Sequence, residues 1–198
     1  MKLNKLAIAM GAVMAMCAGA ASAANDGGNT PTPATTTSTV TGGTIHFKGS
    51  LVDAPCAVST DSDGQTVNLG QYTLSHFSKK GTTGSLKPFN IKLEDCDINV
   101  ASTAAVAFAG RQDATDANLL AIDNGLSGDN AATASGVGIQ IVDEKSKVVP
   151  VDGATFSSPH TLMNGENVLT FAAQYVSTAD TVTAGDANAD ATFIMQYN

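Results

Sequence analysis

The eight residues TIHFKGSL, at positions 44–51, show the pattern that decides the fold of this chain. In this stretch, polar residues alternate with Ile45, Phe47, Gly49 and Leu51. Successive side chains of a β-strand point to opposite faces, so an alternation of period two is typical of a half-buried strand. The pattern therefore predicts a β-strand with one face suited to burial.

Further segments downstream have the same character, and turn residues such as Asp-Gly and Asn-Gly separate them. The expected strands are 66–69, 86–93, 104–109, 137–142, 148–151, 167–176 and 191–197. Composition alone would also allow short helices at 101–109 and 114–121. Many short strands with few helix signals predict an antiparallel β-sandwich.

Composition limits the classes of protein to which the chain can belong. It has 198 residues, a formal net charge of −8 and a charged fraction of 14%, against roughly 25% in typical soluble domains. The length suits a single domain. The acidity argues against nucleic acid as a partner, because phosphate binding requires a basic surface. The low charge suggests a chain that buries more surface than one small domain offers.

The first 23 residues are expected to be a secretory signal peptide. Two lysines precede an apolar run at 6–21, and the sequence Ala-Ser-Ala then ends at Ala23 as a cleavage site, so that Ala24 begins the mature chain. Cleavage would leave 175 residues with a net charge of −10. We expect no transmembrane segment in this mature chain.

Two alternatives to a cleaved signal peptide fit the sequence less well. A retained membrane helix is disfavoured because the apolar run is shorter than the ~20 residues needed to span a bilayer. A lipoprotein anchored at Cys17 is disfavoured because Met16 stands where a small residue is expected.

The two remaining cysteines, Cys56 and Cys96, are expected to form a disulfide, because oxidised cysteine pairs are common in exported proteins. Closing this loop of 40 residues would stabilise the fold by about 4 kcal/mol on the loop-entropy argument. Metal-binding or nucleophilic roles are the weaker alternative, since neither cysteine lies in a C-x-x-C motif or near a histidine.

The sequence offers little that could support catalysis. His46, His76 and His160 are isolated from one another, and no acidic cluster completes a calcium-binding loop. There is no G-x-S-x-G motif, and Arg111 is the only arginine. We therefore expect no enzyme activity, no catalytic residue, no cofactor and no bound metal.

The two best alternating segments lie near opposite ends of the chain, at 44–51 and 191–197. The second segment ends with the given sequence, so we expect no later strand to pair along its edge. An exposed apolar edge strand promotes aggregation unless something covers it. A strand supplied by a neighbouring chain would cover it by β-augmentation.

Four segments resemble the pilins of type 1 fimbriae, which are the major subunits of fibres built by the chaperone–usher pathway. These segments are GGTIHFKGSLVDAPCAV (42–58), FNIKLEDCD (89–97), DGATFSS (152–158) and GDANADATFIMQYN (185–198). They occur in the order of the family, and two of them contain the cysteines. The last segment is similar to the family's C-terminal signature, with a glycine at the fourteenth position from the end and a penultimate tyrosine.

The resemblance implies an all-β fold, namely an incomplete immunoglobulin-like β-sandwich that lacks its last strand and is completed by a donor strand. It implies a signal peptide at 1–23, a flexible N-terminal arm at 24–43, a donor strand at 44–52 and a pilin domain at 53–198. The arm is longer than is usual in the family. It is either a surface tail or an extension of donor pairing through Thr39, Thr41 and Gly43.

The resemblance also implies roles for two sets of residues. The residues expected to fill pockets of a neighbouring subunit are Ile45, Phe47, Gly49 and Leu51. The residues expected on the groove edge that a periplasmic chaperone covers are Gly185, Phe193, Met195, Tyr197 and Asn198. The chaperone would also hold the carboxylate of the last of these.

The function implied is that of a structural major subunit, which is exported through the periplasm and polymerises by donor-strand exchange into surface fimbriae for cell adhesion. Its partners would be other copies of itself, a periplasmic fimbrial chaperone, an outer-membrane usher, and adaptor or tip subunits. One alternative is a minor or adaptor subunit of the same pathway. The other is an exported ligand-binding β-sandwich.

Overall fold

The computed structural model describes residues 37–122 and 132–198. The chain divides into two units, of which the first ends at Lys48 and the second spans Gly49–Asn198. In the first unit, described residues 37–48 form neither helix nor strand and are exposed. The predicted signal peptide and its cleavage site between Ala23 and Ala24 lie outside the described residues.

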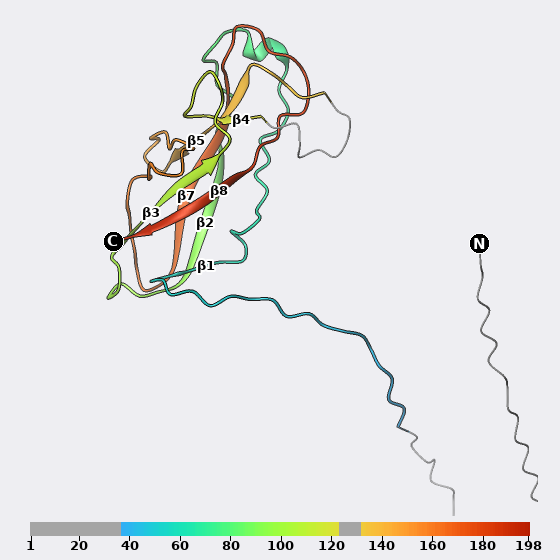
Figure 1. Cartoon of the computed structure of the whole chain (residues 1–198), viewed down its shortest axis with the longest axis vertical. Coiled ribbons are helices and arrows are strands. Elements are labelled where there is room, and N and C mark those ends of the chain that lie inside the picture. Colours follow the sequence, from blue (N-terminus) through green and yellow to red (C-terminus); the bar gives the residue numbers. More distant parts are fainter. Residues whose placement is uncertain (1–36, 123–131) are drawn as a thin grey trace, which may run out of the picture. The chain divides into compact units, whose positions relative to one another are not determined.

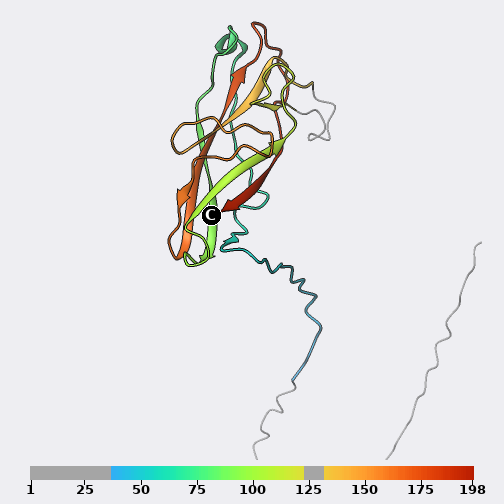
Figure 2. The ribbon, with the colours of Figure 1, turned by 60° about the vertical axis from the view of Figure 1, so that its left-hand side comes forward.

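The second unit is a sandwich of two antiparallel sheets (Figures 1 and 2). The larger sheet has the strand order β1 (Ala57–Val58), β2 (Lys87–Cys96), β7 (Gly165–Ser177), β5 (Val137–Asp143) and β4 (Leu120–Ala121). The smaller sheet has the order β6 (His160–Thr161), β3 (Thr103–Gly110) and β8 (Ala191–Tyr197). A short 3-10 helix, η1, covers Leu74–Phe77.

The hydrophobic core lies between the two sheets. Strand β7 shows how the alternating sequence places it, since Leu169, Phe171 and Ala173 are buried while the residues between them are more exposed. Strand β3, the central strand of the smaller sheet, is buried on both faces from 104 to 108. The core is therefore continuous from one sheet to the other.

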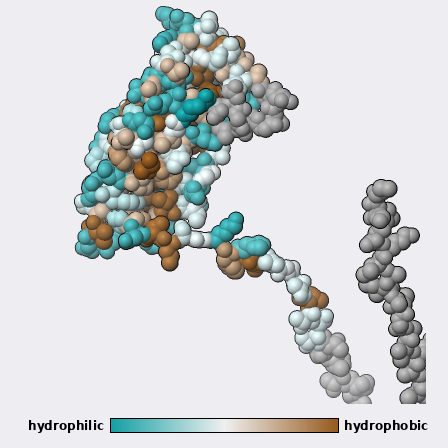
Figure 3. Space-filling model, viewed as in Figure 1, coloured by the Kyte–Doolittle hydropathy of each residue, from teal (hydrophilic) through white to brown (hydrophobic). Residues whose placement is uncertain are grey.

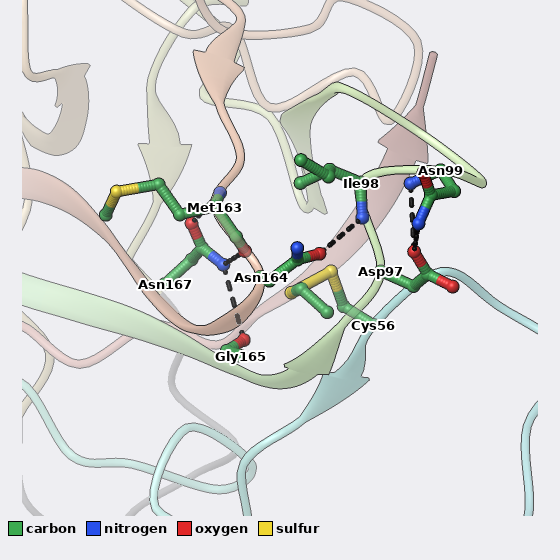
Figure 4. Close-up of a disulfide and its surroundings, with 9 residues drawn as sticks. Cys56, Asp97, Ile98, Asn99, Met163, Asn164, Gly165 and Asn167 are labelled. Atoms are coloured by element: carbon green, nitrogen blue, oxygen red, sulfur yellow. Dashed lines mark hydrogen bonds between the residues drawn. A yellow bond between two sulfur atoms is a disulfide. The ribbon is translucent and has the colours of Figure 1, made fainter.

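The predicted disulfide between Cys56 and Cys96 is confirmed (Figure 4). It joins the residue just before β1 to the last residue of β2, and both cysteines are buried. The bond therefore ties the segment that leads into β1 to the end of β2.

Most of the predicted strands are confirmed, and the predicted span 191–197 coincides with β8. The two helical alternatives are wrong. Residues 101–109 belong mainly to β3, and 114–121 form turns followed by β4. Pairing of β3 on both sides with β6 and β8 outweighs the helix propensity of its alanines.

Two other predictions, of strands outside the observed sheets, are also wrong. Residues 66–69 and 148–151 do not form ladder strands. In the second stretch the amide of Val149 still donates to the carbonyl of Ile141, at 3.0 Å.

Residues 44–51 have an alternating sequence but no ladder partner among the described residues.

A buried carboxylate closes the turn after β5. One oxygen of Asp143 accepts hydrogen bonds from the amides of Lys145 and Lys147, both at 2.9 Å, and the other accepts from the amide of Ser158 at 3.0 Å. Burial raises the pKa of Asp143, but the hydrogen bonds from Ser158, Lys147 and Lys145 together outweigh it and lower the pKa below its ordinary value of 3.8. The ionised form is therefore the one that the folded state favours.

We expect Asp143→Asn to destabilise the domain at pH 7 and to weaken the acid dependence of its stability. Because the folded-state pKa is lowered, the carboxylate stabilises the fold above pH 3.8 and loses this effect as the pH falls through the folded-state pKa. The loss at pH 7 should be about 1–3 kcal/mol, as for other buried charged hydrogen bonds. Urea unfolding at pH 7 and at pH 3 measures both effects.

Asp61→Asn is the matched control, because Asp61 forms an exposed ion pair with Lys92 at 3.2 Å. Such pairs contribute at most about 1 kcal/mol. Equal effects of the two substitutions at pH 7 would contradict the role of Asp143.

Candidate functional site

Strand β8 has one edge that no described strand covers. Among the described residues it pairs only with β3, in a register that sets Phe193 opposite Phe108 and Met195 opposite Val106. We call the side of β8 away from β3 its open edge. A long strand edge presents backbone N–H and C=O groups that can pair with another chain.

A groove borders the first residues of the open edge, Ala191–Phe193, with residues 62–70 on its other side. Its main cavity has a volume of about 1030 Å³. A second cavity of about 560 Å³ continues from it between residues 70–77 and 182–188. The two cavities share Gly70, Tyr175, Ala187 and Asn188, so they form one continuous groove.

The floor of the groove is the hydrophobic core itself. Phe89 from β2 and Phe108 from β3 line it, with ring centroids 6.1 Å apart. Phe171 of β7 packs beneath them, at 5.8 Å and 5.2 Å from the two rings. The remaining floor residues are aliphatic and come from β2, β4, β5 and β7: Ile91, Leu120, Ile139, Ile141 and Ala173. Such a floor suits apolar side chains inserted from outside.

The predicted groove-edge residues of β8 share one face of the strand. Phe193, Met195 and Tyr197 are half-buried and pack against the core, whereas the residues between them are exposed. Phe193 also lines the main cavity. The carbonyl oxygen of Asn198 accepts hydrogen bonds from the amides of Ser102 and Thr103, at 2.8 and 2.9 Å.

Aromatic residues close the η1 end of the groove. The ring of Tyr72 lies 5.5 Å from that of Phe77 and 5.9 Å from that of Tyr175. The hydroxyl of Tyr175 donates to the carbonyl of Ala187 at 2.7 Å, which holds the far wall of the groove. Burial, with a smaller contribution from Tyr72, raises the pKa of Tyr175, and burial also raises the pKa of Tyr197. Both tyrosines are therefore neutral at physiological pH.

The four predicted donor residues are exposed. The side chains of Ile45 and Phe47, in the first unit, are 77% and 90% exposed, and that of Leu51, in the second, is fully exposed. A Cβ added at Gly49 would meet no described atom within 4 Å. Three large apolar side chains thus lie in water on one face of an alternating segment.

Comparison with known proteins gives consistent results. Residues 45–198 match the family described as Fimbrial protein. The chain belongs to this family. It is 54% identical over 167 residues to Fimbrial subunit type 1 of Salmonella typhimurium, covering 84% of this chain and 86% of the relative. It is 45% identical to the Type-1 fimbrial protein, A chain, of Escherichia coli strain K12 over all 198 residues, which is the full length of both.

Solved structures of fimbrial proteins share the fold. A structure of a chaperone–usher pilus has a TM-score of 0.65 and 30% identity, covering 79% of this chain and 95% of the other. The P pilus rod subunit PapA has a TM-score of 0.60 and 28% identity, covering 73% of this chain and all of the other. The protein is therefore a structural fimbrial subunit of a surface fibre, with the incomplete immunoglobulin-like fold that the sequence predicts.

Several residues of the groove in this fimbrial subunit were not singled out from the sequence. Residues 62–70 and 182–188 form its walls, and Tyr72 and Tyr175 close its end. The alternation at Val67 and Leu69 predicted a strand, but nothing in the local pattern indicated that its far side would border a cavity. The wall of a groove forms only where the packing of all other segments leaves part of the core uncovered, and a local pattern does not report this.

Gly185 lies where the wall after β7 meets residues 132–134. A Cβ at this position would collide with the carbonyl oxygen of Ala132. Next to it, the amide of Ala134 donates to the carbonyl of Asp186 at 2.9 Å, and the amide of Asp186 donates to that of Ala132 at 2.8 Å. Only glycine permits this approach of the two backbones.

We expect Gly185→Ala to destabilise the domain by about 1–3 kcal/mol, as overpacking does elsewhere. The methyl group would push the two backbones apart and break the hydrogen bonds on either side of the glycine. Urea unfolding measures the loss. Gly42→Ala is the control, because its Cβ would meet no described atom within 4 Å. Equal stabilities of the two variants would show that the close approach has no energetic importance.

Proposed function

We propose that this fimbrial subunit polymerises by donor-strand exchange, with residues 44–52 of one copy filling the groove of the next. The observation that carries the proposal is the open edge of β8 above an apolar groove, in a chain whose exposed segment has a matching alternation. Each copy then supplies the strand that fills the groove of the next copy.

The lengths of the two partners agree. Residues 45–51 and β8, at 191–197, each comprise seven residues, or roughly 23 Å of extended chain. Every strand pair of the two sheets is antiparallel, so we propose the same orientation for the donor. Leu51 then lies near the start of β8, and Ile45 lies near its end.

Burial supplies much of the driving force. Moving Ile45, Phe47 and Leu51 from water to the groove contributes about 2 kcal/mol each, to which hydrogen bonds along the open edge add. Ordering the donor opposes this gain. Gly49 lets the donor backbone approach the groove floor closely.

Charge also favours a donor strand whose apolar residues face into the groove. When the apolar residues point inward, Lys48 points outward, toward the groove rim. The rim is acidic, with Asp63 and Asp190 at the main cavity and Asp186 at the second. Attraction between these groups would guide the donor strand to the groove.

The same groove accounts for the proposed partners in assembly. Before polymerisation, a periplasmic chaperone would lend a strand to the open edge, contacting Phe193, Met195 and Tyr197 and holding the carboxylate of Asn198. At an outer-membrane usher, the donor strand of the next subunit would replace the chaperone. Adaptor and tip subunits would join the fibre by the same exchange.

We expect Phe47→Ser to reduce the number of surface fibres by more than tenfold. The variant loses about 2 kcal/mol of burial at every junction, and each 1.4 kcal/mol is a factor of ten. Counting fibres by electron microscopy of whole cells measures the effect. His46→Ser is the matched control, because this neighbour lies on the opposite face of the strand, and it should change fibre number less than twofold. Equal fibre numbers for Phe47→Ser and wild type would contradict donor-strand exchange.

We expect Tyr197→Ala to lower the amount of subunit in the periplasm. The half-buried ring supports both the core and the surface that the chaperone would cover. Co-purification of the subunit with its chaperone from periplasmic extracts measures the capture. Gln196→Ala, at an exposed position of the same strand, is the control. Unchanged yield and unchanged co-purification for Tyr197→Ala would count against this role of β8.

A further inference from the structure

Three apolar side chains are exposed at the end of the sandwich where the donor segment enters it. Ile98, Val100 and Met163 are 42%, 68% and 66% exposed, and we call them the basal cluster. Figure 3 shows apolar surface, in brown, at this end of the domain. Ile98 and Val100 follow β2, and Met163 precedes β7.

Hydrogen bonds join the loops that carry the basal cluster to each other. The amide of Ile98 donates to the side-chain oxygen of Asn164, next to Met163, at 3.0 Å (Figure 4). The amide of Met163 in turn donates to the side-chain oxygen of Asn167 at 2.8 Å. The cluster is therefore held on a bonded framework rather than on independent loops.

The donor segment is tied to the same framework. The amide of Asp97 donates to the carbonyl of Pro55 at 3.0 Å, and the disulfide joins the neighbouring residues, Cys56 and Cys96. Pro55 is four residues beyond Leu51, a distance that extended chain spans in at most about 14 Å. A copy that holds Leu51 in its groove must therefore lie close to the basal cluster.

We propose that the basal cluster packs against the η1 end of the next copy of this chain, with Leu74 of that copy as its main contact. The inference rests on the proposed donor-strand exchange. An antiparallel donor places Leu51 near the start of β8, and the groove continues from there between 182–188 and η1. Leu74, on η1, lines this part of the groove and is 49% exposed.

Two exposed lysines next to η1 can pair with acidic residues at the basal end. The basal end carries the exposed acidic residues Glu94, Asp95 and Asp97. The η1 end carries the exposed basic residues Lys79 and Lys80, with Asp180 beside Lys80 and Asp186 on the rim of the second cavity. Bringing these ends together would match acidic with basic groups around an apolar centre, as expected of a specific interface.

Cross-linking of assembled fibres tests the contact. In a chain carrying both Val100→Cys and Leu74→Cys, a short bis-maleimide should join neighbouring copies, giving ladders of linked subunits after full denaturation. Cys56 and Cys96 do not react, because they are paired in the disulfide, and Cys17 belongs to the expected signal peptide. The control carries Val168→Cys with Leu74→Cys, since Val168 is also partly exposed but lies on β7 and should give no ladder.

The outcomes separate this inference from the proposed function. Fibres that resist detergent but give no more cross-linking than the control would overturn the basal contact and leave donor-strand exchange standing. Wild-type fibres that dissociate in detergent would instead contradict donor-strand exchange itself.

A second variant avoids introduced thiols. Val100→Ser combined with Met163→Ser alters only exposed side chains, so the domain should fold and exchange strands normally. Its fibres should bend more easily, with a persistence length at least twofold shorter than that of wild type or of Val168→Ser in electron micrographs. An unchanged persistence length would also overturn the inference.

Discussion

The organisation of this protein depends on the open edge of β8, where unpaired backbone groups border an uncovered part of the hydrophobic core. In the described chain, β8 pairs with β3 alone, and Phe89 and Phe108 line the groove beside it. A strand edge and an apolar floor are each unfavourable in water, and one extended segment can cover both at once. The fold therefore requires a strand from elsewhere.

The rest of the sandwich keeps the groove in shape while it is open. The disulfide closes one end of β2, and the carboxylate of Asp143 holds the turn after β5. Gly185 allows one wall to lie against residues 132–134, and Tyr175 bonds to the carbonyl of Ala187 in the same wall. These contacts do not involve the open edge, so an incoming strand does not have to break them.

Because the donor segment and the acceptor groove are different surfaces of one chain, the proposed contact is head-to-tail and does not close on itself. Contacts of this kind produce filaments of indefinite length. The short connection from Leu51 to Pro55 would also bring two folded domains together at every junction. A strand in a groove resists extension, and contact between domains resists bending, so the two interactions would contribute differently to the mechanics of the fibre.

Much of the fold could be predicted from local pattern, because alternation along a strand reports directly which face is buried. The strand at 191–197 is of this kind. The pairing of Cys56 with Cys96 was predicted on a different ground, because only two cysteines remain in the expected mature chain. The helices allowed at 101–109 were wrong because ladder partners on both sides, which are distant in sequence, decided the conformation. The sequence by itself thus determined which segments were suited to pairing and that this chain was a pilin. Only the tertiary structure decided which residues wall the groove beside this strand, because a groove is the space left between residues 62–70 and β8 once every other segment has packed.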